Sequence, residues 1–376
     1  MSNNLDLEQK IVSFRRSLHQ IPELDFDLPK TRAFLLSVLE PLGFEIRDLG
    51  KAGFSVFIDA GKSETIAFRS DMDALAVTEK EGCDFGSEHA GKMHACGHDG
   101  HMGMLLGLAI KAAENPSELA CNCLLLFQAA EETNGGAKLI CESGVLKDYG
   151  VSRIYGLHLW PGIPASAVSC RPGEFMVGMS ELDVTISGRQ AHIANFKNSA
   201  DALEAGCLFV ARTYQLEKEL PKDVFRILRF GEFFSGTANN IVSGKTHIGG
   251  TLRTYDEKIF ESLIFGMRKI IEGLEAETGV TFAFENSDGY PPVINPQELY
   301  EETEMVLSDA GFTWLASNKP TLYAEDFAFY QREIPGLYMH LGMGNNTRAH
   351  SPEYEMNEDV LISGTLLMWT LLTAKG

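Results

Sequence analysis

The sequence lacks the features of a membrane-bound or secreted protein. Its N-terminus, MSNNLDLEQKIVSF, has neither a basic region nor an apolar stretch, so it does not resemble a signal peptide. No apolar run reaches the ~18 residues that a membrane-spanning helix needs. The seven cysteines are odd in number and do not have the spacing of a disulfide framework. These absences predict a cytoplasmic protein with reduced thiols.

Positive charge is scarce. The chain has 32 Lys and Arg residues against 52 Asp and Glu residues, a formal net charge of −20. Nucleic acids and anionic membrane surfaces bind basic faces, so neither is an expected partner. The acidic excess itself indicates solubility more than any particular function. At 376 residues, 44% of them hydrophobic, the chain is long enough for two globular domains.

The pattern of apolar residues predicts an α/β fold with a second domain inserted into the first. Residues 1–177 and 290–376 alternate between helices and short apolar strands, which is typical of a single α/β domain. Residues 178–289 predict the element order βαββαβ, the order of a ferredoxin-like unit. We therefore expect a discontinuous first domain interrupted by a ferredoxin-like one.

Polar side chains follow the predicted strands of the first domain at the point where each strand ends. They are Asp71 and Asp73 after strand 65–69, Glu131 and Glu132 after strand 123–128, and His158 at the end of strand 154–158. In open α/β sheets, ligands bind beyond the carboxyl ends of the strands. The sequence therefore predicts that these side chains converge on one rim of the sheet.

The segment 93–101 carries the densest group of metal-binding side chains, with a thiol, three imidazoles and a carboxylate. Cys and His are ligands that Zn²⁺ and similar metals favour. One alternative is a buried structural Cys96 beside a helix cap. Another is a Cys96 nucleophile with a His base, which requires the two side chains to face each other. Because Cys96 and His98 are two residues apart on a tight turn, they point more readily at one ion.

One pair of carboxylates and two histidines become candidate site residues if that segment binds a metal. Beside a metal, one carboxylate of Glu131-Glu132 would bind the cation and the other would take a proton from an activated water. Taken alone, the pair could equally be two solvated carboxylates at a helix start. His158 at a strand end and His350 in a loop are the remaining ligand candidates, although each alone would be an ordinary core or loop histidine.

The chain resembles the M20 metallopeptidase superfamily, in its aminoacylase-like amidohydrolase branch. That branch includes hippurate hydrolases, plant auxin-conjugate hydrolases and N-acetyl-diaminopimelate deacetylases. The resemblance covers nearly the whole chain, in ordered motifs that begin at residue 15 and end at residue 355. They are RRSLHQIPEL, FRSDMDAL, MHACGHDGHM, QAAEET, YGLHLWP, NIVSG, GTLRT, AEDFAFY and AHSPEYE.

The resemblance implies a mixed-sheet α/β catalytic domain with a di-metal site, and an inserted lid that also forms a dimer. The implied metal ligands are Cys96, His98, Glu132, His158 and His350. Cys96 would bridge two divalent ions as a thiolate, with Glu132 and His350 on one ion and His98 and His158 on the other. Zn²⁺ is the expected metal, and Mn²⁺, Co²⁺ and Ni²⁺ are alternatives.

The resemblance also implies roles for residues that do not bind metal. Glu131 would be the general base, and Asp73 would orient a ligand imidazole. His192 of the lid would reach a substrate oxygen across a homodimer and stabilise the oxyanion, although an exposed loop histidine is the alternative. Asn240 and Arg253 would bind the free carboxylate of the substrate, although Arg253 could equally form a salt bridge within the lid.

The remaining polar residues of the metal-binding segment are expected to support it. Asp99 and His101 have this role, whereas His94 is left unassigned. The chain departs from the family at Ala76 and Ala129, where proline is usual, and at Phe196-Lys197, where the lid commonly has Pro-His. None of these changes removes a ligand or the base, but the lid change leaves the substrate open.

The function implied is hydrolysis of the amide bond of an N-acyl (acetyl or aroyl) L-amino acid, a small molecule, by a homodimer paired through the lid. The exposed edge strand of a ferredoxin-like unit offers a surface for that pairing. The alternatives are a dipeptidase of the same superfamily, a thiol hydrolase built on Cys96, and a non-catalytic relative. The intact base and ligand set argue against the last of these.

Overall fold

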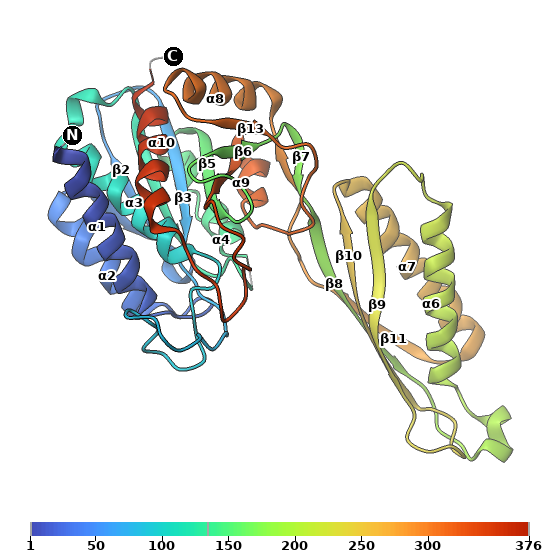
Figure 1. Cartoon of the computed structure of the whole chain (residues 1–376). Helices are drawn as coiled ribbons and strands as arrows, with labels where there is room; N and C mark the ends of the chain where they lie inside the picture. The colour runs from blue at the N-terminus through green and yellow to red at the C-terminus, as the bar shows by residue number, and fades with distance from the viewer. Residues whose placement is uncertain (1, 134, 375–376) are drawn as a thin grey trace. The chain divides into compact units, whose positions relative to one another are not determined.

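The computed structural model describes residues 2–133 and 135–374, which form two compact units (Figure 1). The first unit comprises residues 1–175, 294–320 and 326–376. The second comprises residues 176–293 and 321–325. Each unit has a hydrophobic core of its own.

An eight-stranded mixed sheet forms the centre of the first unit. In spatial order its strands are β1 (Glu45–Asp48), β2 (Gly53–Ile58), β4 (Asn122–Gln128), β3 (Thr65–Asp71), β5 (Val151–Trp160), β14 (Gly336–Gly342), β6 (Val168–Cys170) and β13 (Trp314–Ala316). Strand β3 is parallel to β4 and β5, and β14 is parallel to β5, whereas β2 is antiparallel to β4. Every residue of β3, β4 and β14 is buried, so both faces of the sheet centre are covered. The predicted mixed α/β architecture is confirmed.

Three helices, α1 (Ser2–His19), α3 (His98–Glu114) and α10 (Leu361–Thr373), pack against one another (Figure 1). Gly107 permits the close approach of α1 to α3, because a Cβ atom there would lie 2.7 Å from Ile11 Cδ1. The other helices of this unit are α2 (Pro29–Leu39), α4 (Gly136–Glu142), α5 (Val145–Asp148), α8 (Gln297–Asp309) and α9 (Ala328–Glu333). Within the described ranges, no helix combines the length and the hydropathy needed to cross a membrane.

The second unit has a four-stranded antiparallel sheet covered by two helices. Along the chain the elements are β8 (Gly178–Ser187), α6 (Ala202–Glu219), β9 (Arg226–Ser235), β10 (Lys245–Thr254), α7 (Glu257–Thr278) and β11 (Thr281–Asn286). The spatial order of the strands is β11-β8-β10-β9. Alternate residues of β8 are buried, so one face of this sheet packs on the helices and the other is open.

A short segment distant in the sequence completes the second unit. Residues 321–325 are held by the Val177 N–H, which donates to the Tyr323 carbonyl at 3.1 Å, and by the Tyr255 hydroxyl, which donates to the Thr321 carbonyl at 2.6 Å. The sequence did not indicate that this segment belongs there. Strand β12 (Val293–Asn295) pairs with β7 (Gly173–Met176) where the chain returns to the first unit.

Candidate metal centre

The carboxyl ends of β3, β4 and β5 form a polar rim. Asp71 is in register with Gln128, so β3 and β4 end together. Just beyond these ends, the Asp73 carboxylate accepts the backbone N–H groups of Glu131 and Glu132, each at 3.0 Å. The side chains that follow the two strands in sequence therefore meet in space.

Gly97 sets the positions of Cys96 and His98. It has φ +94°, in the left-handed region, and a Cβ atom there would lie 2.6 Å from the Tyr354 hydroxyl. Glycine is therefore required both for the turn and for the contact. The turn ends directly in α3, so His98 is the first residue of the helix. The first helical residues, HDGH, give little helical signal of their own, so the turn at Gly97 defines where the helix begins.

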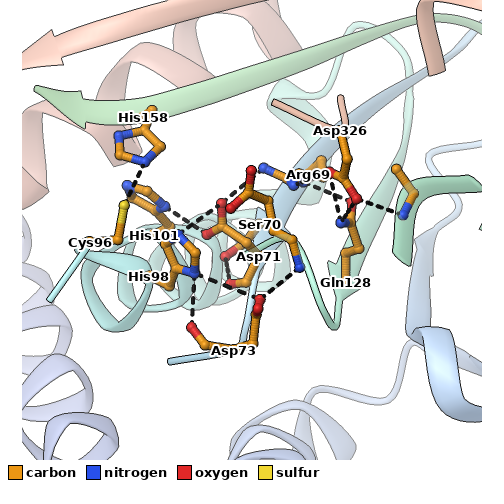
Figure 2. A network of polar contacts seen from close by, with 12 residues as sticks. Arg69, Ser70, Asp71, Asp73, Cys96, His98, His101, Gln128, His158 and Asp326 are labelled. Carbon is orange, nitrogen blue, oxygen red and sulfur yellow. Dashed lines mark hydrogen bonds and ion pairs between the residues drawn. The ribbon is translucent and has the colours of Figure 1, made fainter. Parts of the chain in front are cut away.

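Backbone carbonyls fix the orientation of two imidazoles. Nδ1 of His98 lies 2.8 Å from the Asp73 carbonyl, and Nδ1 of His158 lies 2.8 Å from the Leu159 carbonyl. A carbonyl only accepts, so both Nδ1 atoms carry the proton and both Nε2 atoms keep a free lone pair. Nε2 of His158 is 3.5 Å from Cys96 Sγ. Figure 2 marks this contact with a dashed line. Among the described residues, Nε2 of His98 has no hydrogen-bond partner although it is buried.

Two groups of ligand atoms share Cys96. One group is Cys96, His98 and His158, and the other is Cys96, Glu132 and His350. Within each group the atoms lie within 4.8 Å of one another, so each could hold one ion. Glu132 Oε1 is 3.2 Å from His350 Nε2, which ties the His350 loop to the end of β4. A thiolate, imidazoles and a carboxylate are a donor set that suits borderline divalent metals.

The backbone is strained on both sides of the second group. Ala130 and His350 each have φ +58°, which is unfavourable for a residue with a Cβ atom. The His350 N–H also donates to the Ala95 carbonyl at 2.9 Å, so the loop is fixed beside Cys96. Both strained positions are therefore at or near ligands of the second group, whose Glu132 and His350 side chains contact each other at 3.2 Å.

The charge around Cys96 opposes a free thiolate. Burial, followed by the Glu132 and Glu131 carboxylates, raises the pKa of the Cys96 thiol well above its usual range. A bound cation reverses this, because it stabilises the thiolate directly. Glu131 is itself buried, and a carboxylate oxygen of Glu131 lies within 4.8 Å of ligand atoms of His98 and Glu132.

A buried polar network lies behind the rim (Figure 2). Its members Arg69, Gln128 and Asp326 were not identified as site residues from the sequence. Nδ1 of His101 is 2.7 Å from Asp71, and Nε2 of His101 accepts the Leu159 N–H at 3.0 Å. Both His101 nitrogens are therefore occupied, which leaves it no lone pair for a metal. Arg69 donates to Asp71 at 2.8 Å and to Asp326 at 2.7 Å. The signal in the sequence was an arginine inside an otherwise apolar strand.

Asp99 faces away from the ligand atoms, toward α1. Its carboxylate lies 2.9 Å from Arg15 Nε and 2.7 Å from His19 Nδ1. Burial alone would raise the pKa of Asp99, but Arg15 and His19 outweigh it and hold that pKa well below its usual range. His94 is fully buried, and burial lowers its pKa to about 3, so its imidazole is neutral.

The other predicted site residues lie in the second unit, at its two ends. The exposed His192 is next to Asn240, because the Ile193 N–H donates to the Asn240 carbonyl at 3.0 Å and His192 pairs with Ile241. Arg253 is near the other end of β10, where its guanidinium donates to the Leu322 carbonyl at 2.7 Å. Eight residues of extended strand, roughly 26 Å, separate Arg253 from the start of β10 at Lys245.

Comparisons with known proteins agree with this architecture. The family model for peptidase family M20/M25/M40 matches residues 67–374. A crystal structure of a putative aminohydrolase from methicillin-resistant Staphylococcus aureus has a TM-score of 0.92 at 29% identity, covering 98% of this chain and 97% of that one. A dinuclear metal-binding peptidase of the M20 family from Bacillus subtilis has a TM-score of 0.84 at 27% identity, covering 98% of both chains.

Two relatives with assigned names also match this chain over nearly its whole length. An N-acetyldiaminopimelate deacetylase of Lacticaseibacillus paracasei is 33% identical, over 95% of this chain and 95% of its own. An IAA-amino acid hydrolase of Arabidopsis thaliana is 33% identical, over 96% of this chain and 85% of its own. The chain therefore belongs to the peptidase family M20/M25/M40 and is a hydrolase of that family.

Proposed function

We propose that this protein is a metal-dependent amidohydrolase that cleaves the amide bond of N-acyl L-amino acids. The observation that carries the proposal is the pair of ligand groups that share Cys96, with Glu131 buried beside them. The names of the relatives support the substrate class, since one is a deacetylase of N-acetyldiaminopimelate and another is a hydrolase of IAA-amino acids.

Cys96 would bridge the two ions, with His98 and His158 on one and Glu132 and His350 on the other. The distances within the two groups support this division. Zn²⁺ suits the donor set best, and Mn²⁺, Co²⁺ or Ni²⁺ are alternatives. When bound, the ions would lower the pKa of a water molecule and polarise the scissile carbonyl.

Glu131 is proposed as the general base. Its carboxylate takes the proton of the attacking water and returns it to the leaving amine nitrogen. Asp73 holds the backbone of Glu131 and Glu132 through its carboxylate, and it orients the His98 imidazole through its carbonyl. One residue therefore positions both the base and a ligand.

We further propose a homodimer in which segment 178–289 acts as a ferredoxin-like lid. His192 would stabilise the oxyanion, and Asn240 and Arg253 would bind the substrate carboxylate. Because Asn240 and Arg253 lie toward opposite ends of β10, one chain is unable to bring both to one carboxylate. The site is therefore complete only if one subunit supplies Arg253 and the other supplies Asn240 and His192.

Exposed apolar side chains support a contact surface at the His192 end of the lid. Ile193, Phe196 and Phe234 are 51%, 59% and 64% exposed. Ile241, which pairs with His192, is 37% exposed. The segment after β8 and the β9–β10 connection project together beyond the sheet (Figure 1). Large exposed apolar side chains gathered in one place are typical of a binding surface.

The decisive experiment removes the base and keeps the ligands. Glu131→Gln should slow turnover by ~10²–10⁴-fold or more while the metal content per subunit stays unchanged. Glu142→Gln, an exposed position on α4, is the matched control and should keep full activity. Full activity in Glu131→Gln with metal content verified would contradict the mechanism.

A substrate panel separates the proposal from a dipeptidase, the second candidate of the same family. N-acetyl and N-benzoyl amino acids should be hydrolysed, whereas dipeptides place a charged α-amine where the acyl group sits. Preference for dipeptides would favour the second candidate. Activity that survives a chelator but is lost to a thiol alkylator would instead favour a thiol hydrolase.

A further inference from the structure

A second Cys–His–Glu group lies outside the rim, between the end of α1 and the segment that precedes α3. It consists of His19, Glu79 and Cys83, whose ligand atoms all lie within 4.8 Å of one another. His19 is the last residue of α1, and the other two belong to the connection between β3 and α3. The proposed catalytic reaction uses none of the three.

The imidazole of His19 is held as metal-binding imidazoles usually are. Its Nδ1 lies 2.7 Å from Asp99, a carboxylate that Arg15 also contacts at 2.9 Å. Its Nε2 faces the other way and lies 3.0 Å from Glu79 Oε1. A carboxylate behind one ring nitrogen fixes the ring and makes the other nitrogen a better ligand. A cation bound by both Nε2 and Oε1 would replace the hydrogen bond between them.

We propose that His19, Glu79 and Cys83 bind one further divalent ion of the zinc type. The donors are the same three kinds as in the group of Cys96, Glu132 and His350. In that group, too, an imidazole Nε2 lies close to a carboxylate oxygen, at 3.2 Å. One thiolate, one imidazole and one carboxylate suit Zn²⁺ and leave a fourth position for water.

The arrangement gives the ion an entry path and a structural effect. Cys83 is exposed, Glu79 is partly buried and His19 is buried, so the ligands lead inward from solvent. The segment already contacts the chain just after α1, since the Glu88 N–H donates to the Gln20 carbonyl at 2.8 Å. A bound ion would join this segment to the end of α1 more firmly, as a clamp rather than as a catalytic centre.

The first test counts ions in the intact enzyme. Wild-type protein with its catalytic metals loaded is dialysed against buffered free Zn²⁺, and zinc per subunit is measured by elemental analysis. Cys83→Ser should hold one ion fewer than wild type, whereas Cys207→Ser, which removes another exposed cysteine, should equal wild type. The difference of one ion is independent of how many ions the catalytic site holds, so it stands apart from the proposed function. Equal zinc in wild type and Cys83→Ser would overturn the proposal.

The second test uses chemical protection of the thiol. At a free Zn²⁺ concentration ten times the dissociation constant, alkylation of Cys83 should slow by ~10-fold, because only the unoccupied fraction reacts. Cys207, read by mass spectrometry in the same sample, should react at an unchanged rate. In Glu79→Gln the protection of Cys83 should require more Zn²⁺. Alkylation of Cys83 at the same rate with and without Zn²⁺ would also overturn the proposal.

Discussion

The carboxylate of Asp73 accepts the backbone N–H of Glu131 through Oδ1, at 3.0 Å. Its other oxygen accepts the N–H of Glu132 at the same distance. The turn that carries the proposed base and the proposed ligand is therefore held by one buried side chain. Asp73 comes from the end of β3 and the two glutamates from the end of β4, so the contact also joins two strand ends.

Asp73→Asn replaces one acceptor oxygen by an amide that donates. One of the two backbone N–H groups then loses its partner and faces another donor, so the Glu131-Glu132 turn should shift. We expect a fall of about 10–100-fold in metal affinity or turnover, as is usual for residues that orient ligands. The measurements are kcat and zinc per subunit at fixed free Zn²⁺. Asp59→Asn, at an exposed position after β2, is the control and should change neither.

Cys96→Ser tests whether one sulfur serves both ligand groups. A serine hydroxyl is a poor ligand for Zn²⁺, so both ions should bind more weakly, and zinc per subunit should fall by nearly two ions under conditions that saturate wild type. Cys123→Ser is the matched control, since this thiol is also buried but lies within β4. That variant should lose stability and keep its zinc. Loss of a single ion in Cys96→Ser would contradict a bridging role.

The rim was predictable from sequence because its residues are local to strand ends. Asp73, Glu131 and His158 each lie within three residues of a strand end, and parallel strands bring such positions together. The apolar runs in the sequence and the polar residues that follow them are therefore enough to predict the rim. The ligand spacing around Cys96 is likewise local.

The network behind the rim was not predictable, because it depends on pairs that are distant along the chain. Arg69 and Asp326 are 257 residues apart and meet only once the sheet and α9 have packed. Residues 321–325 also join the second unit through contacts with residues that are distant along the chain. The start of α3 is likewise hard to predict from sequence, because a left-handed Gly97, and not helix propensity, begins that helix. Local sequence patterns do not predict features that depend on contacts between distant parts of the chain.

His340 gives the fold a pH dependence that can be isolated. Burial lowers the pKa of its imidazole from 6.5 to about 3, and the ring stacks on Trp160 at 3.8 Å. Since the unfolded chain binds a proton between those values and the folded one does not, stability rises with pH from 3 to 6.5. Moving from pH 7 to pH 5 should therefore cost about 2 kcal/mol from this group alone.

His340→Phe keeps the ring stack and removes the titration. Between pH 7 and pH 5, the variant should therefore lose about 2 kcal/mol less unfolding free energy than wild type. Denaturant unfolding followed by tryptophan fluorescence measures this, because Trp160, Trp314 and Trp369 all lie in the first unit. Equal losses in the variant and wild type would show that His340 is protonated in the folded protein.

Mixed dimers test whether the substrate site is shared between subunits. Asn240→Ala and Arg253→Ala should each be nearly inactive as homodimers, since every site lacks one carboxylate partner. In a random mixture half of the dimers are mixed, and each has one site with both residues intact. Activity should therefore recover to about a quarter of wild type. Mixing Asn240→Ala with His192→Ala should give no recovery, because both residues come from the same subunit. A mixture of Asn240→Ala and Arg253→Ala that stays inactive after verified subunit exchange would contradict a substrate site shared in this way.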